Sequence, residues 1–141
     1  MLGVILASHG DLVYGLKDTY NMVMGDLPEN VKIVSLRKDS DAEIFKKEFH
    51  EAISGFHDVD GILVLTDLEG GTPYNTACVY YFDQDFGTDV RVLTGMNFPM
   101  LVETIENMES ADVSRAAETI LDLTKEGIRQ AEIINNEDED F

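Results

Sequence analysis

The stretch TDLEGGTP, residues 66–73, decides the fold because it joins an apolar run to an amphipathic segment through a glycine-rich turn. The run before it, Gly61–Thr66, is apolar without alternation, as in a strand that is buried on both faces. The segment after it, Pro73–Phe82, has helical character. Thr72 is the expected N-cap, and Pro73 would occupy the first helical position, where its missing N–H is harmless. This stretch therefore predicts one strand-turn-helix unit of a parallel sheet.

The same unit recurs along the chain, with short apolar runs alternating with amphipathic segments. The expected strands are Leu2–Ala7, Val31–Leu36, Gly61–Thr66 and Val90–Thr94, and the expected helices are Leu12–Met24, Asp41–Phe56, Pro73–Phe82, Pro99–Met108 and Val113–Ile128. Strands that alternate with helices favour an α/β fold with a doubly wound, mostly parallel central sheet and helices on both faces. The expected strand order is 2-1-3-4. Ala131–Ile134 is a candidate for a short final strand, and Glu137–Asp140 is an acidic tail.

The composition excludes several classes of protein. The chain has 141 residues, with 10 Lys and Arg against 28 Asp and Glu, which gives a formal net charge of −18. Nucleic acids and anionic membranes are bound by clustered cations, so neither is an expected partner. No apolar run approaches the ~20 residues that span a bilayer. Cys78 is the single cysteine, which excludes an internal disulfide framework and a multi-cysteine zinc site. We expect a cytoplasmic, acidic protein.

The residues with chemical potential follow the strands. His9 lies after the first strand, Asp67 after the third, and Asn97 after the fourth. In an open α/β sheet, ligands bind beyond the carboxyl ends of the strands, where the strand order reverses. With the order 2-1-3-4, the first and third strands are neighbours at that point. The sequence therefore predicts that His9 and Asp67 face each other across a crevice.

This pair suits phosphoryl chemistry. A carboxylate that accepts from one imidazole nitrogen fixes the tautomer and raises the basicity of the other nitrogen. Such an imidazole can act as a general base, a metal ligand or a nucleophile. Gly70 and Gly71 allow the backbone to approach a ligand closely, and Thr72 supplies a hydroxyl at a helix N-terminus, which favours anions. The combination points to a dianionic phosphoryl group near His9.

Other readings of these residues are weaker. A histidine at a strand end is often structural, and a Gly-Gly pair often only forms a tight turn. The sequence lacks the P-loop and the dinucleotide fingerprint. His50 and His57 form no metal-ligand spacing with each other or with His9, so we expect no metal and no other cofactor. A metal-dependent hydrolase built on His9 and Asp67 lacks a third ligand at a plausible spacing.

Three motifs resemble one family. They are ASHG at residues 7–10 with Gly15 and Leu16 after it, TDLEGGTP at 66–73 with Asn75, and TGMNFPML at 94–101. In this order and spacing the chain resembles the mannose-family (mannose/fructose/sorbose type) EIIA component of the bacterial phosphoenolpyruvate-dependent sugar phosphotransferase system. The resemblance extends to about Ile128 and implies an EIIA domain over residues 1–130.

The resemblance implies roles for the site residues. His9 would accept a phosphoryl group on Nε2 from the phosphohistidine of HPr and pass it to a histidine of EIIB, while Asp67 would orient the ring through Nδ1. Thr72 stands where the family often has serine. The remaining residues that would contact the phosphoryl group or a partner are Ser8, Gly10, Gly70, Gly71, Thr72 and Asn97.

The resemblance also implies partners. These are HPr, the cognate EIIB, and a second copy of the chain, with which a carboxy-terminal antiparallel strand would be exchanged. Residues 131–141 would supply that strand and the acidic tail. Contact with the membrane EIIC/EIID complex would run through EIIB, without direct membrane insertion. Two alternatives stay open: the phosphotransfer subunit of a dihydroxyacetone kinase, and a regulatory module whose phosphorylation state is read by a partner.

Overall fold

The computed structural model describes residues 1–134. Four strands alternate with helices until β4, after which two helices follow in succession. Their bounds in chain order are β1 Leu2–His9, α1 Leu12–Met24, β2 Val31–Leu36, α2 Ala42–Ser54, β3 Gly61–Thr66, α3 Thr72–Phe82, β4 Val90–Leu93, α4 Phe98–Glu106 and α5 Val113–Glu126.

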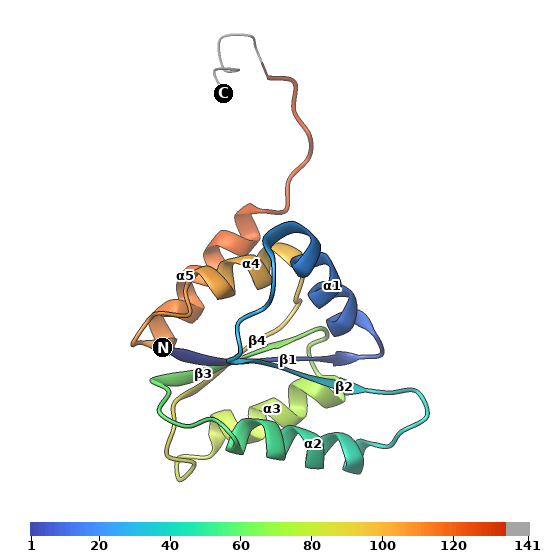
Figure 1. Cartoon of the computed structure of the whole chain (residues 1–141), viewed down its shortest axis with the longest axis vertical. Helices are drawn as coiled ribbons and strands as arrows, with labels where there is room; N and C mark the ends of the chain where they lie inside the picture. Colours follow the sequence, from blue (N-terminus) through green and yellow to red (C-terminus); the bar gives the residue numbers. More distant parts are fainter. Residues whose placement is uncertain (135–141) are drawn as a thin grey trace.

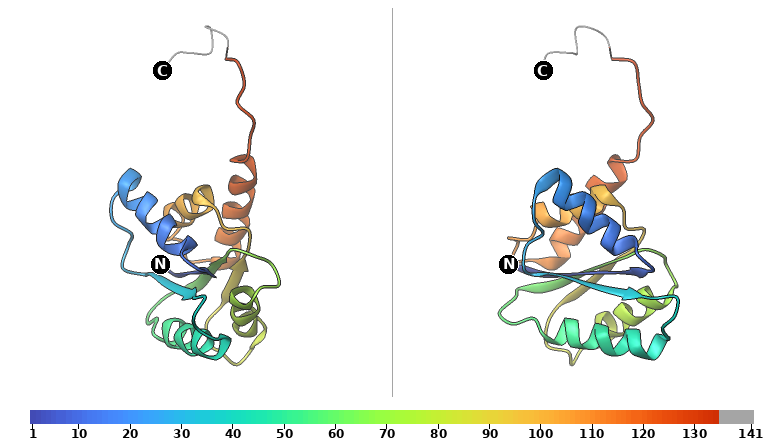
Figure 2. Two further views of the ribbon diagram at one scale, coloured as in Figure 1. Left: turned by 90° about the vertical axis from the view of Figure 1, so that its right-hand side faces the viewer. Right: turned by 45° about the vertical axis from the view of Figure 1, so that its right-hand side comes forward.

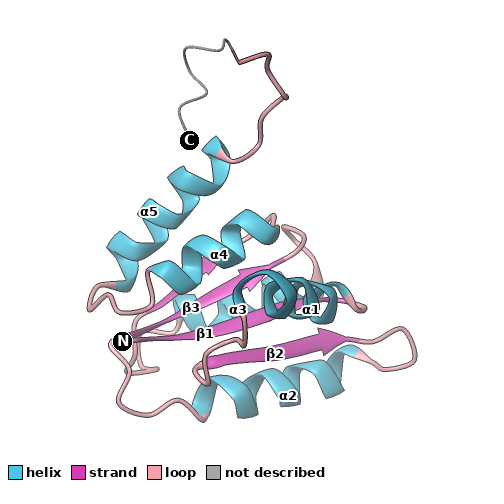
Figure 3. Ribbon diagram, turned by 45° about the horizontal axis from the view of Figure 1, so that its top comes forward, coloured by secondary structure: helices cyan, strands magenta, loops and turns pink. Residues whose placement is uncertain are grey.

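The four strands form one sheet in the order β2-β1-β3-β4, which confirms the predicted order. Every neighbouring pair is parallel. In the register, Ala7 lies opposite Thr66, and His9 lies opposite Leu36. The carboxyl ends of β1, β2 and β3 therefore meet at one edge of the sheet, and their loops gather there (Figure 3).

Helices cover both faces of the sheet (Figure 1). On one face α1, α4 and α5 pack over side chains of β1 such as Val4 and Leu6. On the other face α2 and α3 pack over Ile5 and Ala7. Strand β1 thus sends alternate side chains into two cores, as a central parallel strand does. Full burial of each large aliphatic side chain contributes about 1.5–3 kcal/mol, so β1 anchors the edge that carries His9.

Several element ends differ from the sequence-based expectation. Strand β1 continues to His9, while β4 stops at Leu93, before Thr94. Helix α3 begins at Thr72 with Gly71 as its N-cap, so the prediction that Thr72 is the N-cap was wrong. Pro73 then stands at the second helical position, which it tolerates equally because no intrahelical carbonyl is available there. The other helices either match or end within two residues of the prediction.

The segment after α5 extends away from the body of the protein (Figure 2). Ala131–Ile134 belongs to no strand in this single chain. An exchanged strand needs a second copy as its partner, so the strand exchange stays a prediction. The acidic residues Glu137–Asp140 lie outside the described residues. Among the helices of residues 1–134, none combines the length and the apolar character needed to cross a bilayer.

Candidate functional site

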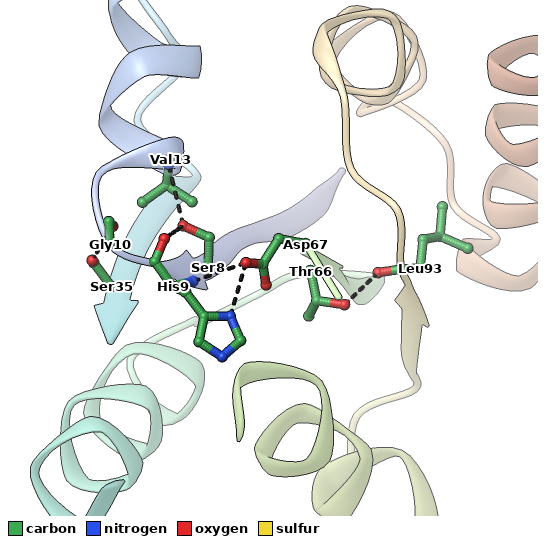
Figure 4. Close-up of polar contacts among 8 residues, drawn as sticks. All are labelled: Ser8, His9, Gly10, Val13, Ser35, Thr66, Asp67 and Leu93. Atoms are coloured by element: carbon green, nitrogen blue, oxygen red, sulfur yellow. Dashed lines mark hydrogen bonds and ion pairs between the residues drawn. The ribbon is translucent and has the colours of Figure 1, made fainter. Parts of the chain in front are cut away.

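His9 and Asp67 lie together at the carboxyl edge of the sheet (Figure 4). One oxygen of Asp67, Oδ2, accepts two hydrogen bonds from His9. The first comes from ring Nδ1 at 2.9 Å and the second from the backbone N–H at 3.0 Å. Because both bonds end on the same carboxylate oxygen, they fix the position of the carboxylate and the orientation of the ring together. Neighbouring strands place the two residues side by side, as their sequence positions suggested.

This geometry sets the tautomer of His9. A carboxylate only accepts hydrogen bonds, so Nδ1 carries the proton and Nε2 presents its lone pair. The His9 side chain is 43% exposed, whereas that of Asp67 is only 15% exposed. The carboxylate is therefore shielded behind the ring while Nε2 remains accessible from outside. An imidazole held in this way is suited to act as a nucleophile or a base.

Gly71 makes room for the imidazole. A Cβ atom at this position would lie 2.7 Å from Cε1 of His9 and 3.4 Å from Nε2. Real Cβ atoms do not approach a ring carbon so closely, so any side chain at Gly71 would displace the ring. The absence of a side chain at Gly71 therefore allows the imidazole to lie against the backbone of this residue.

The start of α3 supplies backbone donors next to the ring. The N–H of Gly71 donates to Leu68 O, and the N–H of Asn75 donates to Gly71 O. Pro73 has no N–H. In the described part of the chain, the N–H groups of Thr72 and Tyr74 therefore keep no backbone acceptor, as expected for the first turn of a helix. The N-terminal end of the helix dipole adds a partial positive charge near His9.

The loop before α3 is held in shape by Asn75. Its side-chain Nδ2 donates to the carbonyl of Gly70 at 3.0 Å. Gly70 has a φ of 82°, in the left-handed region that glycine adopts without strain. In the sequence Asn75 is only one residue of the TDLEGGTP motif region; the bond that holds the loop is formed in the folded chain.

Ser8 and Gly10 take part in the turn after β1. The Ser8 side chain is fully buried, donates to His9 O and accepts from the N–H of Val13. The N–H of Gly10 donates to Leu36 O, and its φ is 57°. The Ser8 hydroxyl and the Gly10 N–H are thus used in hydrogen bonds within the protein, and these bonds fix the turn that follows His9. Direct contact of Ser8 and Gly10 with a phosphoryl group stays a prediction.

Asn97 caps α4. Its Oδ1 accepts from the N–H of Met100 at 2.9 Å, which satisfies one unpaired donor in the first helical turn. The adjoining loop is tied to β3 because the N–H of Met96 donates to Thr66 O at 3.0 Å. Asn97 was expected to contact the phosphoryl group or a partner, and its visible contact is this cap. The sequence itself indicates this cap, because Asn followed two residues later by proline is typical of the start of a helix.

Arg37 was not among the predicted site residues. It follows β2 at the carboxyl edge of the sheet. Leu36, the residue before it, lies opposite His9. The Arg37 guanidinium lies 3.6 Å from a carboxylate oxygen of Glu48. Interaction with the Tyr14 hydroxyl and, after it, the negative charge of Glu48 raise the pKa of Arg37. Arg37 thus places a positive charge after β2, the strand that lies beside β1 and His9.

A groove of about 380 Å³ runs between α2 and α3, beginning at Thr72 and continuing past Asn75 to Tyr80. Burial raises the pKa of Tyr80, whose hydroxyl lies 2.8 Å from Nδ1 of His50. Interaction with the neighbouring Cys78 thiol raises the pKa of Tyr74. The Cys78 side chain is partly exposed. Among the residues described, no group of three or more His, Cys, Asp and Glu side chains could hold a metal ion.

Comparisons with known proteins agree with this arrangement. The EIIA-man family model, described as "PTS system fructose IIA component", matches residues 3–121. The fructose-specific EIIA component of Bacillus subtilis is 28% identical over 109 residues, which are 77% of this chain and 72% of that protein. The sorbose-specific EIIA component of Lacticaseibacillus casei is 24% identical over 98% of this chain and 99% of its own.

A mannose-specific EIIAB component of Escherichia coli is 29% identical over 74% of this chain, which spans only 31% of that protein. Among solved structures, the EIIA component from Streptococcus agalactiae gives a TM-score of 0.83 at 24% identity, covering 92% of this chain and 97% of its own. A IIA protein from the fucose utilization operon of Streptococcus pneumoniae gives 0.72 at 27% identity, covering 86% and 89%. The chain belongs to the EIIA-man family of phosphotransferase-system components.

Proposed function

We propose that this protein is a phosphocarrier of sugar uptake, in which His9 takes a phosphoryl group from phospho-HPr and gives it to a histidine of EIIB. One observation carries the proposal: Asp67 Oδ2 lies 2.9 Å from Nδ1 of His9. This contact turns the lone pair of Nε2 toward the outside. Family membership supports a role in sugar phosphotransfer, and the geometry supports His9 as the residue that carries the group.

The reaction follows from the arrangement of the residues. Nε2 of His9 attacks the phosphorus of phospho-HPr, the N–P bond on HPr breaks, and its electron pair remains on the HPr imidazole. The new N–P bond leaves positive charge on the His9 ring, which the Nδ1–H bond to Asp67 stabilises. The N–H groups of Thr72 and Tyr74, which have no backbone acceptor among the described residues, would donate to the phosphoryl oxygens. Such transfers depend on positioning and charge stabilisation more than on covalent work by the protein. In the second transfer, a histidine nitrogen of EIIB attacks the phosphorus on His9, the N–P bond of His9 breaks, and its electron pair returns to Nε2.

The charge of the protein suits partners with a basic face. The formal net charge of −18 repels anions at a distance, so a phosphorylated partner must approach through its own cationic surface. Opposite potentials accelerate such encounters, and salt screens them. Transfer from HPr should therefore slow as ionic strength rises. Through EIIB the protein would also reach the membrane components EIIC and EIID, which choose the sugar.

A second copy of the chain would complete the sheet at β4. This strand pairs with β3 alone within the described residues. Beside it lies a cavity of about 220 Å³ lined by Tyr81, Phe82, Arg91 and Val92, among others. Phe82 is 73% exposed, and exposed apolar groups beside an unpaired edge favour strand addition. We propose that Ala131–Ile134 of a second copy is the strand added there.

The central test is the transfer of phosphate from phosphoenolpyruvate through enzyme I and HPr. The protein should acquire an acid-labile, base-stable phosphate, and His9→Ala should acquire none. His50→Gln and His57→Gln are matched controls that leave the site untouched and should label like the wild type. Label that persists in His9→Ala, or that is absent from the wild type, would overturn the proposal.

Onward transfer separates the remaining alternatives. A phosphocarrier passes its label to a cognate EIIB of the mannose family within the same mixture. A regulatory module retains the label when EIIB is added. A phosphotransfer subunit of a dihydroxyacetone kinase gives its phosphate to that kinase and not to EIIB. The acceptor of the label therefore distinguishes a phosphocarrier, a regulatory module and a dihydroxyacetone kinase subunit.

A further inference from the structure

The imidazole of His9 leaves the sheet on the side that α2 and α3 cover. Side chains two residues apart in a strand point to the same face, and His9 follows Ile5 and Ala7, which pack in the core beneath these two helices. Gly71, the N-cap of α3, lies against the ring, and Figure 4 shows the imidazole on the same side of the sheet as α2 and α3. A protein that brings phosphate to Nε2 therefore meets these helices.

The groove between α2 and α3 starts beside the imidazole. Thr72, the residue after Gly71, lines one end of the groove, and Val79 lines it further along α3. Val79 follows Thr72 by seven positions, which is about 10 Å of helix at 1.5 Å per residue. A protein–protein contact of standard size covers about 800 Å² on each partner, a patch of about 16 Å in radius. A phosphate donor centred on His9 therefore covers the groove as far as Val79.

The lining of the groove has the composition of an interface core. Ala42, Val79 and Tyr80 supply apolar and aromatic surface, and no carboxylate is among the described residues that line it. The charged residue among them is Lys46, whose ammonium lies 3.2 Å from a carboxylate oxygen of Glu43. Charged residues are depleted at the core of protein interfaces and aromatic residues are enriched there. The groove therefore suits an apolar side chain of a partner.

Carboxylates border the groove on its α2 side. Asp41 and Glu43 are both exposed, and they flank Ala42, which lines the groove. An apolar interior with an acidic border is complementary to an apolar side chain that is surrounded by cations, because polar groups gather at the rim of an interface and opposite charges orient the partners. The partner that fits this groove is therefore a protein with a basic face and an apolar residue within it.

We propose that the groove between α2 and α3 is the docking site of the phosphate donor HPr, and that it receives an apolar side chain that lies beside the phosphohistidine of HPr. The inference rests on the proposed function of His9 and deepens it, because it names the surface that recognises the donor. The apolar side chain contacts Val79 and Tyr80, and the cations of HPr meet Asp41 and Glu43. An anchor in a groove fixes the orientation of the donor, which brings its phosphorus to Nε2.

The contact is tested directly by amide NMR spectroscopy of the full chain during titration with unphosphorylated HPr. We expect the signals of Ala42, Asn75 and Val79 to shift, and those of Met22 and Val23 at the end of α1 to stay in place. Groove signals that stay in place, whether HPr binds elsewhere or not at all, would overturn the proposal. Groove signals that move only with EIIB, or only as the concentration of the protein itself is raised, would also overturn it, because the occupant would be a different molecule.

Val79→Asp tests what the groove contributes to transfer. A carboxylate at this position would be buried without a partner beneath the apolar side chain of HPr. The KM for phospho-HPr should therefore rise about 10-fold with little change in kcat, as for a lost binding contact. Val23→Asp is the matched control, since it makes the same change of charge on another helix and Val23 is 62% exposed against 64% for Val79. This control should keep the wild-type KM.

Phosphoramidate separates docking from chemistry, because this small phosphate donor has no surface to place in the groove. Nε2 of His9 attacks its phosphorus, the P–N bond breaks, and ammonia leaves with the electron pair of that bond. The wild type, Val79→Asp and Val23→Asp should all be labelled by phosphoramidate at one rate. If Val79→Asp loses as much rate with phosphoramidate as with phospho-HPr, the effect lies at His9 itself and the docking role is overturned.

The two proposals fail in different ways. If the wild type takes no phosphate from phospho-HPr on His9, the proposed function fails, whatever the NMR titration shows for the groove. If the wild type is labelled by phospho-HPr and the KM of Val79→Asp equals that of Val23→Asp, only the docking role of the groove fails.

Discussion

Gly71 and His9 are in such close contact that a methyl group on Gly71 would lie 2.7 Å from Cε1 of the imidazole. The ring occupies the space that any other residue at this position would need. Gly71→Ala should therefore tilt His9 away from Asp67 and from the start of α3. Small displacements of a reacting group cost about 10- to 100-fold in rate, and we expect a loss of that size in phosphorylation by phospho-HPr.

Gly15→Ala is the matched control for this substitution. Gly15 lies inside α1, and a Cβ there would meet no atom from outside its own stretch of helix within 4 Å. Alanine favours a helix over glycine by about 1 kcal/mol, so this variant should be phosphorylated normally and be slightly more stable. If Gly71→Ala labels at the rate of Gly15→Ala, close contact at Gly71 has no part in the site.

Asp67→Asn tests the carboxylate itself. An amide can bind Nδ1 through either its oxygen or its NH2 group, so it no longer selects one tautomer of His9. We expect slower phosphorylation, on the order of 10- to 100-fold, with an intact fold. Circular dichroism checks the fold, and a time course of labelling gives the rate. Asp89→Asn, which alters the Asp89–Arg91 pair at the opposite edge, should leave the rate unchanged. Equal rates in the two variants would reject the pairing of Asp67 with His9.

The fold and the central pair could be read from the sequence for a simple physical reason. Strands such as Leu2–His9 and Gly61–Thr66 are buried on both faces, and burial of that kind requires an unbroken apolar run that is visible in one dimension. The rule that carboxyl ends of parallel strands share an edge then brings His9 toward Asp67 without knowledge of any contact.

The finer parts of the site depend on contacts that a sequence does not record. Ser8 precedes His9 in the chain, and only the fold shows that its buried hydroxyl donates to His9 O and accepts from the N–H of Val13. Gly71 resembles an ordinary turn residue until the ring is placed against it. The shift of the N-cap from Thr72 to Gly71 lies within the usual uncertainty of a helix start.

Asn97→Ala tests whether Asn97 acts through the α4 cap. Loss of the bond from the N–H of Met100 to its Oδ1 should lower the free energy of unfolding by about 1 kcal/mol. Urea denaturation measures this change. Asn97→Asp keeps an accepting oxygen and should retain most of the stability. A stability equal to the wild type combined with a large loss of phosphorylation would instead give Asn97 a direct part in transfer.

Tyr80 should make the stability of the protein depend on alkaline pH. Burial raises the pKa of Tyr80 above its ordinary value of 10.0, so the unfolded chain loses this proton at a lower pH than the folded chain. The contribution of the neutral phenol is complete below its unfolded-state pKa and is lost as the pH rises through the folded-state pKa. Urea midpoints at pH of about 8 and about 10.5 should therefore differ less in Tyr80→Phe than in the wild type. Tyr81→Phe retains Tyr80 and should keep the wild-type difference.

Phe82→Asp tests the proposed contact between two copies of the chain. Phe82 is 73% exposed and lines the cavity beside β4, so a carboxylate there would oppose an apolar partner strand and reduce dimerisation. Met22→Asp is the matched control, because Met22 is 89% exposed at the end of α1, away from β4. Sedimentation velocity over a range of concentrations gives the fraction of dimer. We expect a dimer in the wild type and in Met22→Asp, and a monomer in Phe82→Asp. A wild type that stays monomeric, or a Phe82→Asp variant that still dimerises, would remove the β4 edge as the site of association, without bearing on the chemistry of His9.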